Sequence, residues 1–233
     1  MRKLLLFITI LSFSLVGVAQ NDFLKEADKQ SDDRKMDNDP KAQELLDEVS
    51  ATFKGYQSLK SSFTVQIADE REIIDTYGGV VYLKGDKFRL ETDDAEIISN
   101  GVKKWVYLKE SNEVQISYYD PNGETIESPS QLFTLYERDF YFYMNGTANV
   151  DGKEVAQVKL IPTNVEESDY THVILHIDRE QKRIVQAVIH GRDGVQYTWQ
   201  LKDFETGIAL SDELFNFNAG DYPDDIYIDD MTN

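Results

Sequence analysis

The three histidines are the residues of this 233-residue chain that could bind a transition metal or exchange a proton near neutral pH. His172 and His176 lie four residues apart in a strand-like segment, so their side chains share one face. Two ligands at that spacing on a strand are too far apart to chelate one zinc ion without distortion, and the chain has no cysteine to complete a site. His190 precedes Gly191 and is expected in a turn. The sequence therefore predicts no metal site.

Other catalytic patterns are equally weak. The sequence contains no Gly-x-Ser-x-Gly nucleophile motif, no phosphate-binding loop and no dinucleotide-binding fingerprint. The acidic pairs at residues 93–94 and 224–225 lack the spacing of a calcium-binding loop. Paired carboxylates arise by chance in a chain with 43 acidic residues, so they do not indicate a glycosidase. We expect no cofactor and no enzymatic activity, and we rank an unrecognised hydrolase last.

The chemistry that the sequence does favour is the burial of apolar surface. Strands expected at residues 172–178 and 184–190 carry apolar side chains on both faces. The more apolar faces carry Val173, Leu175 and Ile177 in the first strand, and Val185, Ala187 and Ile189 in the second; the opposite faces carry Ile174, and Ile184 with Val188. Two interpretations explain this pattern equally well. One is ordinary core packing, and the other is a curved sheet whose concave face lines an apolar pocket.

One helix must pack against these strands. Asp39 and Pro40 form a helix start, with aspartate as N-cap and proline in the first helical position, and Gly55 ends the helix. Five apolar residues fall on one face at helical spacing: Ala42, Leu45, Leu46, Val49 and Phe53. A second helix is expected to start at Ser128 and Pro129 and to continue to about Tyr136.

The remaining elements are strands. Residues 79–116 form a β-meander, in which Asn100 and Gly101 give the strongest hairpin signal. Residues 80–83 are all apolar or aromatic, so both faces of that strand need cover. Further strands are expected at residues 63–67, 155–161 and 196–204. With about ten or eleven strands in all, the sequence predicts a mainly β barrel or sandwich.

Charge and hydropathy divide the chain into segments. Residues 1–19 combine Arg2 and Lys3 with an apolar run and small residues, as in a cleaved signal peptide, and no later run is long enough to span a membrane. Residues 20–39 are expected to be a disordered acidic linker, and residues 229–233 an acidic C-terminal tail. The net charge of −19 argues against a nucleic-acid partner.

Four short motifs occur in a specific order: Gly-x-x-Tyr-Leu-Lys at residues 79–84, Phe-Arg at 88–89, Ile-Ile-Ser-Asn-Gly at 97–101 and Trp-x-Tyr at 105–107. In this order the chain resembles the LolA family of periplasmic lipoprotein carriers, over residues 40–228. The resemblance implies an unclosed antiparallel β-barrel whose helices cover an apolar concave face. It also implies a monomer in the periplasm that binds the acyl chains of lipoproteins or lipids.

The resemblance further implies the site and the partners. The chain would load at an inner-membrane lipoprotein-releasing complex and unload at an outer-membrane acceptor. The helix near residue 133 would be a lid over the cavity, either movable or fixed. The expected lipid-binding residues are Leu83, Phe88, Leu90, Leu132, Phe133, Val173, Leu175, Val185, Ala187 and Ile189.

One departure from the family pattern concerns the lid. The better-studied members have an arginine followed by a proline after the second strand, and this arginine helps to close the lid. The corresponding residues here are Lys84, Gly85 and Asp86. Gating by an arginine is therefore not expected. A sensor or scaffold domain of the same fold, which binds protein partners, is the alternative function.

Overall fold

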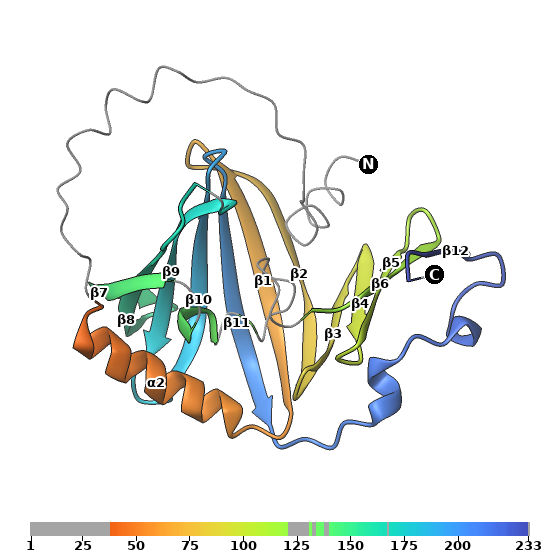
Figure 1. Cartoon of the computed structure of the whole chain (residues 1–233), viewed down its shortest axis with the longest axis horizontal. Helices are drawn as coiled ribbons and strands as arrows, with labels where there is room; N and C mark the ends of the chain where they lie inside the picture. The colour runs from red at the N-terminus through yellow and green to blue at the C-terminus, as the bar shows by residue number, and fades with distance from the viewer. Residues whose placement is uncertain (1–37, 121–130, 132–133, 138–139, 167, 233) are drawn as a thin grey trace.

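A computed structural model of the chain describes residues 38–120, 131, 134–137, 140–166 and 168–232. These residues form helix α2, several short 3-10 helices and one 12-stranded sheet (Figure 1). The expected signal peptide, nearly all of the linker and the expected helix start at Ser128 and Pro129 lie outside the described residues. The mainly β fold with an unclosed sheet is confirmed.

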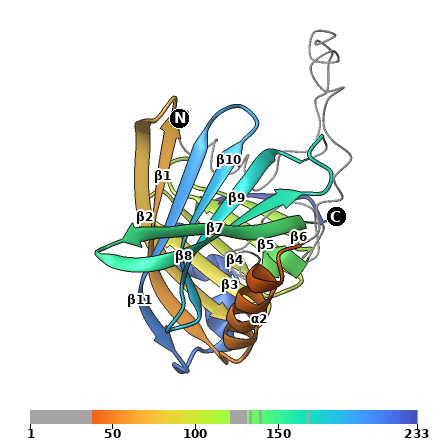
Figure 2. The same cartoon turned by 90° about the vertical axis from the view of Figure 1, so that its left-hand side faces the viewer.

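Helix α2 (Pro40–Lys54) begins and ends where the sequence predicts. The side chain of Asp39 accepts a hydrogen bond from the backbone N–H of Lys41 at 2.9 Å, which satisfies one of the free donors at the helix start. Ala42, Leu45, Leu46 and Val49 are buried against the sheet, and Phe53 is partly buried. The amphipathic pattern therefore fixes which side of the helix packs (Figure 2).

Twelve strands are present in the described part of the chain. Their bounds are β1 (Leu59–Asp69), β2 (Glu72–Lys84), β3 (Lys87–Thr92), β4 (Ala95–Ser99), β5 (Lys103–Leu108), β6 (Glu113–Tyr118), β7 (Phe140–Val150), β8 (Lys153–Pro162), β9 (Tyr170–Asp178), β10 (Arg183–Gly191), β11 (Gln196–Thr206) and β12 (Tyr227–Asp230). The aromatic run at residues 140–143 begins β7. The other expected strands are present, most of them longer than predicted.

The sheet has two edges, β12 and β7, in the order β12-β6-β5-β4-β3-β2-β1-β11-β10-β9-β8-β7. Neighbours pair antiparallel except β12 and β6, which pair parallel. Asp229 and Asp230 were expected in an acidic tail, but they pair with Gln115 and Ile116 of β6. This strand brings the total to twelve.

The main hydrophobic core fills the concave side of the sheet, between the strands and α2. Cross-strand register places Leu83 opposite Phe88, and Val81 opposite Leu90. All four side chains are at most 3% exposed. Period-two alternation then sends Tyr82 and Arg89, an opposed pair on the same two strands, to the convex side.

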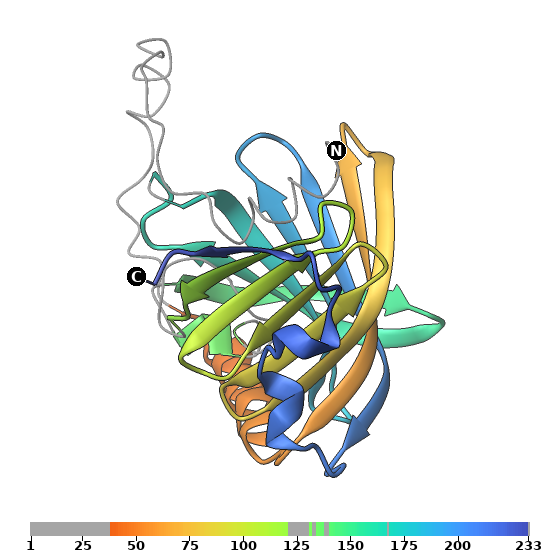
Figure 3. The ribbon, with the colours of Figure 1, turned by 90° about the vertical axis from the view of Figure 1, so that its right-hand side faces the viewer.

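A second, smaller cluster covers the convex side of β4–β6. Residues 207–226, here named the C-terminal strap, run across this face (Figure 3). The cluster consists of Ile98, Trp105, Tyr107, Val114 and Ile116, with Phe217, Tyr222 and Ile226 of the strap packed against it. Both faces of this part of the sheet are therefore covered, one by the main core and the other by the strap.

Candidate functional site

The concave face is filled by aromatic side chains that pack against one another. Phe63 of β1 stacks on Trp199 of β11, with ring centroids 5.5 Å apart. Phe88 meets the ring of Tyr119 edge-on at 5.4 Å. Such packing positions the side chains firmly, because offset and edge-on aromatic pairs are favoured arrangements. The interior is thus a packed apolar core in this conformation.

Most of the expected lipid-binding residues lie together in this core. The shared cluster contains Leu83, Phe88, Leu90, Val173, Leu175, Ala187 and Ile189. Ile189, at 8% exposed, is the most accessible of the seven. They come from the β2–β3 hairpin and the β9–β10 hairpin, so the fold brings together two hairpins that are far apart in the sequence. Leu132 and Phe133 lie outside the described residues.

Val185 does not fit the expected pattern. The register between β9 and β10 shifts between Ile184 and Gln186, which indicates a β-bulge at Val185. Because of this extra residue, Ile184 joins Ala187 and Ile189 in the core, and Val185 is only half-buried and outside the cluster. Strict alternation along the strand had assigned Ile184 to the opposite face.

A cavity of about 310 Å³ opens at one end of this core. It lies where the end of α2, the start of β1 and the β2–β3 hairpin meet, and here it is named the mouth. Its lining residues are Phe53, Lys54, Tyr56, Ser58, Leu59, Leu83, Gly85, Asp86, Tyr119, Gln131 and Thr134. Leu83 is the one expected site residue among them. Leu59, Leu83, Tyr119 and Gln131 are buried in its lining, whereas Lys54 and Asp86 are exposed and bring charge to its rim.

Sequence reasoning missed the mouth because its walls come from element ends. Gly55 and Gly85, which end α2 and form the β2–β3 turn, were the available signals. Gly85 has φ +58°, a left-handed conformation that favours glycine, and a Cβ added there would meet nothing within 4 Å. The turn therefore leaves open space beside the mouth.

The short 3-10 helix η2 (Leu135–Glu137) is fastened to α2 beside the mouth. Ser50 and Lys54 of α2 donate hydrogen bonds to the Glu137 carboxylate, at 2.7 Å and 2.6 Å. Burial raises the pKa of Glu137, but these two donors outweigh it and leave the pKa below its ordinary value. Tyr136 donates to Asp47 at 2.9 Å, and burial with this bond raises the pKa of Tyr136 to about 12. At neutral pH the Glu137 carboxylate is charged and Tyr136 keeps its proton.

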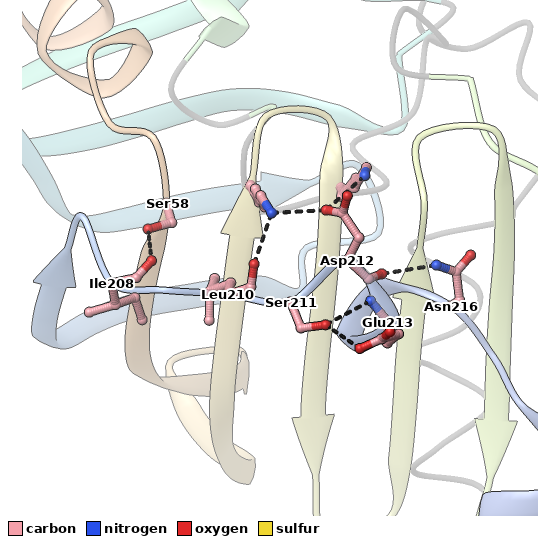
Figure 4. A network of polar contacts seen from close by, with 9 residues as sticks. Ser58, Ile208, Leu210, Ser211, Asp212, Glu213 and Asn216 are labelled. Atoms are coloured by element: carbon pink, nitrogen blue, oxygen red, sulfur yellow. Dashed lines mark hydrogen bonds and ion pairs between the residues drawn. The ribbon is translucent and has the colours of Figure 1, made fainter.

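Of the three residues at the place of the family's arginine-proline pair, Lys84 contacts the strap, whereas Gly85 and Asp86 line the mouth. Lys84 donates to the backbone oxygen of Leu210 at 2.8 Å and to the Asp212 carboxylate at 2.9 Å (Figure 4). Ser58, which lines the mouth, donates to the backbone oxygen of Ile208 at 2.6 Å. The start of the strap thus forms hydrogen bonds with the start of β1 and with the end of β2, on the outside of the mouth.

The histidines lie on the convex face. His172 and His190 stack with ring centroids 4.1 Å apart, and His190 belongs to β10, so its prediction as a turn residue is wrong. Burial, then the neighbouring His190 and Lys159, lower the pKa of His172 to about 4. His176 pairs with Gln157 at 2.9 Å. Across the described residues there is no group of three or more potential metal ligands.

None of the helices in the described part of the chain is long and apolar enough to cross a membrane.

The sequence match decides the family. Residues 54–218 match the family model described as outer membrane lipoprotein carrier protein LolA. This protein belongs to the LolA family. The match spans most of the chain, including the mouth and much of the strap, and it confirms the resemblance seen in the short motifs. A comparison with curated proteins found no sequence match.

A solved structure with a TM-score above 0.5 supports the fold. An uncharacterized conserved protein from Thermus thermophilus is 16% identical, covers 82% of this LolA-family chain and 99% of its own, and superposes with a TM-score of 0.55. Lipoprotein LppX of Mycobacterium tuberculosis is 12% identical, with coverage of 75% and 100% and a TM-score of 0.46. A MucA/MucB complex structure from Pseudomonas aeruginosa is 16% identical, with coverage of 77% and 62% and a TM-score of 0.44.

Proposed function

We propose that this protein is a periplasmic carrier that binds the acyl chains of lipoproteins, or of lipids, and moves them toward the outer membrane. The signal peptide at residues 1–19 directs export, an inner-membrane releasing complex loads the carrier, and an outer-membrane acceptor unloads it. No chemical step is needed, because the cargo changes place and not structure. The family match supports this proposal, since the family is named for lipoprotein carriers.

The observation that carries the proposal is the continuity between the mouth and the apolar core. Leu59 and Leu83 belong both to the lining of the mouth and to the core cluster on the concave face. A chain end that enters the mouth meets apolar surface at once and finds the core directly behind it. The 310 Å³ of the mouth is at the lower end of the roughly 300–1,000 Å³ of small-molecule sites. Deeper uptake requires core side chains to move.

The energetics suit transport, because an acyl chain in water is unfavourable by about 0.8 kcal/mol for each exposed methylene. A few methylenes buried in the mouth already stabilise a complex, and further burial strengthens it. A carrier must also release its cargo. If core side chains move aside only while cargo is bound and repack when it leaves, binding stays reversible. The polar rim formed by Lys54 and Asp86 remains available to the polar part of the cargo.

Filling the mouth tests the proposal. Thr134 lines the mouth and is half-buried, so Thr134→Trp adds a large side chain there without disturbing the core. Excluding two methylenes costs roughly 1.6 kcal/mol, so we expect binding of a fluorescent N-acylated peptide to weaken at least about tenfold. The control is Thr198→Trp on the convex face, opposite Val188 in the β10–β11 pair, which should bind as the unmodified protein does.

Mass spectrometry of the protein isolated from the periplasm gives an independent measure. A bound lipid or lipidated polypeptide, depleted in Thr134→Trp but retained in Thr198→Trp, is the expected result. Equal acyl-peptide binding by both variants, with no lipid in the isolated protein, would disprove the carrier proposal.

A second candidate function is a sensor or scaffold domain of the same fold that binds a protein partner. Its supporting observation is that the interior is filled by its own side chains, as in the pair of Phe63 and Trp199. Lys84, at the place of the arginine-proline pair, also contacts the strap instead of the interior. A protein that is lipid-free when isolated and does not bind acyl chains would favour this function.

A further inference from the structure

The exposed hydrophobic residues are concentrated at one edge of the sheet. In the described ranges, eight large hydrophobic side chains are exposed, and five of them lie on or beside β5, β6 and β12. These are Val102, Tyr118, Tyr227, Ile228 and Met231, which are 46–65% exposed. We name them, with the open side of β12, the edge patch.

Among the described residues, no strand pairs with β12 on the side away from β6. Tyr227 and Met231 donate their N–H groups to the backbone oxygens of Asn112 and Ile116, each at 2.9 Å. Because alternate residues of a strand bond to the same neighbour, the N–H and C=O of Ile228, between these two, point away from β6. Since β12 is the last strand of the sheet, these groups face the open edge.

The opposite edge is protected, which makes this one distinctive. At β7, Asp39 donates its N–H to the Phe142 oxygen at 3.0 Å, and the Asn38 side chain accepts from the Phe142 N–H at 3.0 Å. The Asp39 carboxylate also accepts from the Met144 N–H at 3.2 Å. Residues before α2 thus satisfy the outer edge of β7 at Phe142 and Met144. Sheet edges are usually blunted in this way, by a short strand or by charges.

The edge patch has a strong negative charge that determines its partner. Asp224 and Asp225 precede β12 and are exposed, and Asp229 and Asp230 belong to it. Lys103, whose ammonium donates to Thr232 at 2.9 Å, lies at one end of this group. A second copy of this chain paired along the same edge would bring four like charges of each copy together, which is unfavourable. A positively charged strand would instead be attracted.

We propose that the open edge of β12 binds an extended, basic segment of another protein, which adds a thirteenth strand to the sheet. Backbone hydrogen bonds to Ile228 give the segment its register. Its apolar residues cover Tyr227 and Met231, which lie on one side of β12, and its lysine or arginine residues pair with the aspartates. The short length of β12 and its acidic residues also protect it from other exposed edges. This interaction does not depend on cargo binding in the mouth.

A synthetic strand tests the proposal on the intact protein. The probe is a fluorescein-labelled peptide of alternating lysine and valine, followed by fluorescence anisotropy. One control peptide has glutamate in place of lysine, and another has the lysine-valine sequence with alternate backbone nitrogens methylated. We expect the first peptide to bind and both controls to bind at least about tenfold more weakly, because one control reverses the charge and the other removes strand hydrogen bonds.

Matched variants locate the binding edge. Ile228→Pro removes the N–H that points to the open edge and leaves the bonds from β12 to β6, so it should weaken binding about tenfold. Ile228→Ala keeps that N–H and should bind within about threefold of the unmodified protein. Circular dichroism checks that both variants fold. If Ile228→Pro does not fold, the methylated peptide alone decides.

Three results would overturn the proposal. The first is no binding of the lysine-valine peptide. The second is equal binding of the methylated peptide, which would show charge attraction without strand pairing. The third is a concentration-dependent dimer that Ile228→Pro abolishes, which would assign the edge to a second copy of the chain.

Discussion

Phe88 connects the core to the mouth, and its replacement by alanine tests how firmly the interior is packed. The ring is 1% exposed, lies opposite Leu83 across β2 and β3, and meets Tyr119 edge-on at 5.4 Å. Leu83 and Tyr119 both line the mouth. Removing the ring therefore leaves a void directly behind the mouth.

The complete burial of the Phe88 ring determines how much unfolding free energy Phe88→Ala should lose. A fully buried Phe→Ala change usually costs about 3–5 kcal/mol of unfolding free energy, because transfer and cavity terms add. Native domains are stable by about 5–15 kcal/mol, so Phe88→Ala should fold with a lower urea midpoint. Trp199, stacked on Phe63 in the same core, provides a fluorescence signal for the transition. Phe88→Leu, which keeps most of the volume, is the control and should lose less.

The same variant separates stability from cargo binding. Since the new void adjoins the mouth, Phe88→Ala should bind an acylated peptide at least as tightly as the unmodified protein while it is less stable. A loss below about 1 kcal/mol would refute the reasoning, because it would show that the ring is not packed against its neighbours. Phe88→Glu, which could otherwise seem a selective block of cargo binding, is expected to unfold the protein, because the carboxylate would be buried without a partner.

Two further predictions concern polar contacts. Asp178, whose carboxylate pairs with Lys153 at 2.9 Å and accepts the N–H of Gln181 at 3.1 Å, has a pKa below its ordinary 3.8, since these bonds outweigh the effect of burial. Its contribution to stability is therefore present at neutral pH and is lost as the pH falls below about 3.8, so thermal melts of Asp178→Asn should depend less on acid than those of the unmodified protein. An equal acid dependence would contradict this. Tyr222→Phe removes the hydroxyl that donates to Glu96 at 2.8 Å and should lower the unfolding free energy by about 0.5–1.5 kcal/mol in urea; no change would mean that water replaces the hydroxyl.

The local signals in the sequence predicted much of the fold. The bounds of α2 could be predicted directly, because Asp39 caps its start, Pro40 favours the first helical position and Gly55 caps its end. Alternation along β9 correctly placed Val173 and Leu175 in the core.

The misses depend on contacts between distant segments. The bulge at Val185 arises in the pairing of β9 with β10, and the residues of one strand do not reveal it. The charges at Asp229 and Asp230 suggested a solvated tail, because parallel pairing with β6 leaves no local pattern. The mouth depends on three element ends that meet in space, so its residues could not be derived from periodicity.

The pairing of β1 with both β2 and β11 has a consequence for how the chain folds. β1 lies between β2, which follows it directly in the chain, and β11, which ends at Thr206. Pairing β1 with β11 therefore closes a loop that contains all the strands from β2 to β10. Closing long loops is entropically costly, and such non-local pairing slows folding. We expect two locally formed meanders, β2–β6 and β7–β11, to appear early, and their union at β1 to be the slow step. Until Leu59–Asp69 finds residues 196–206, the apolar face of each meander stays exposed to water.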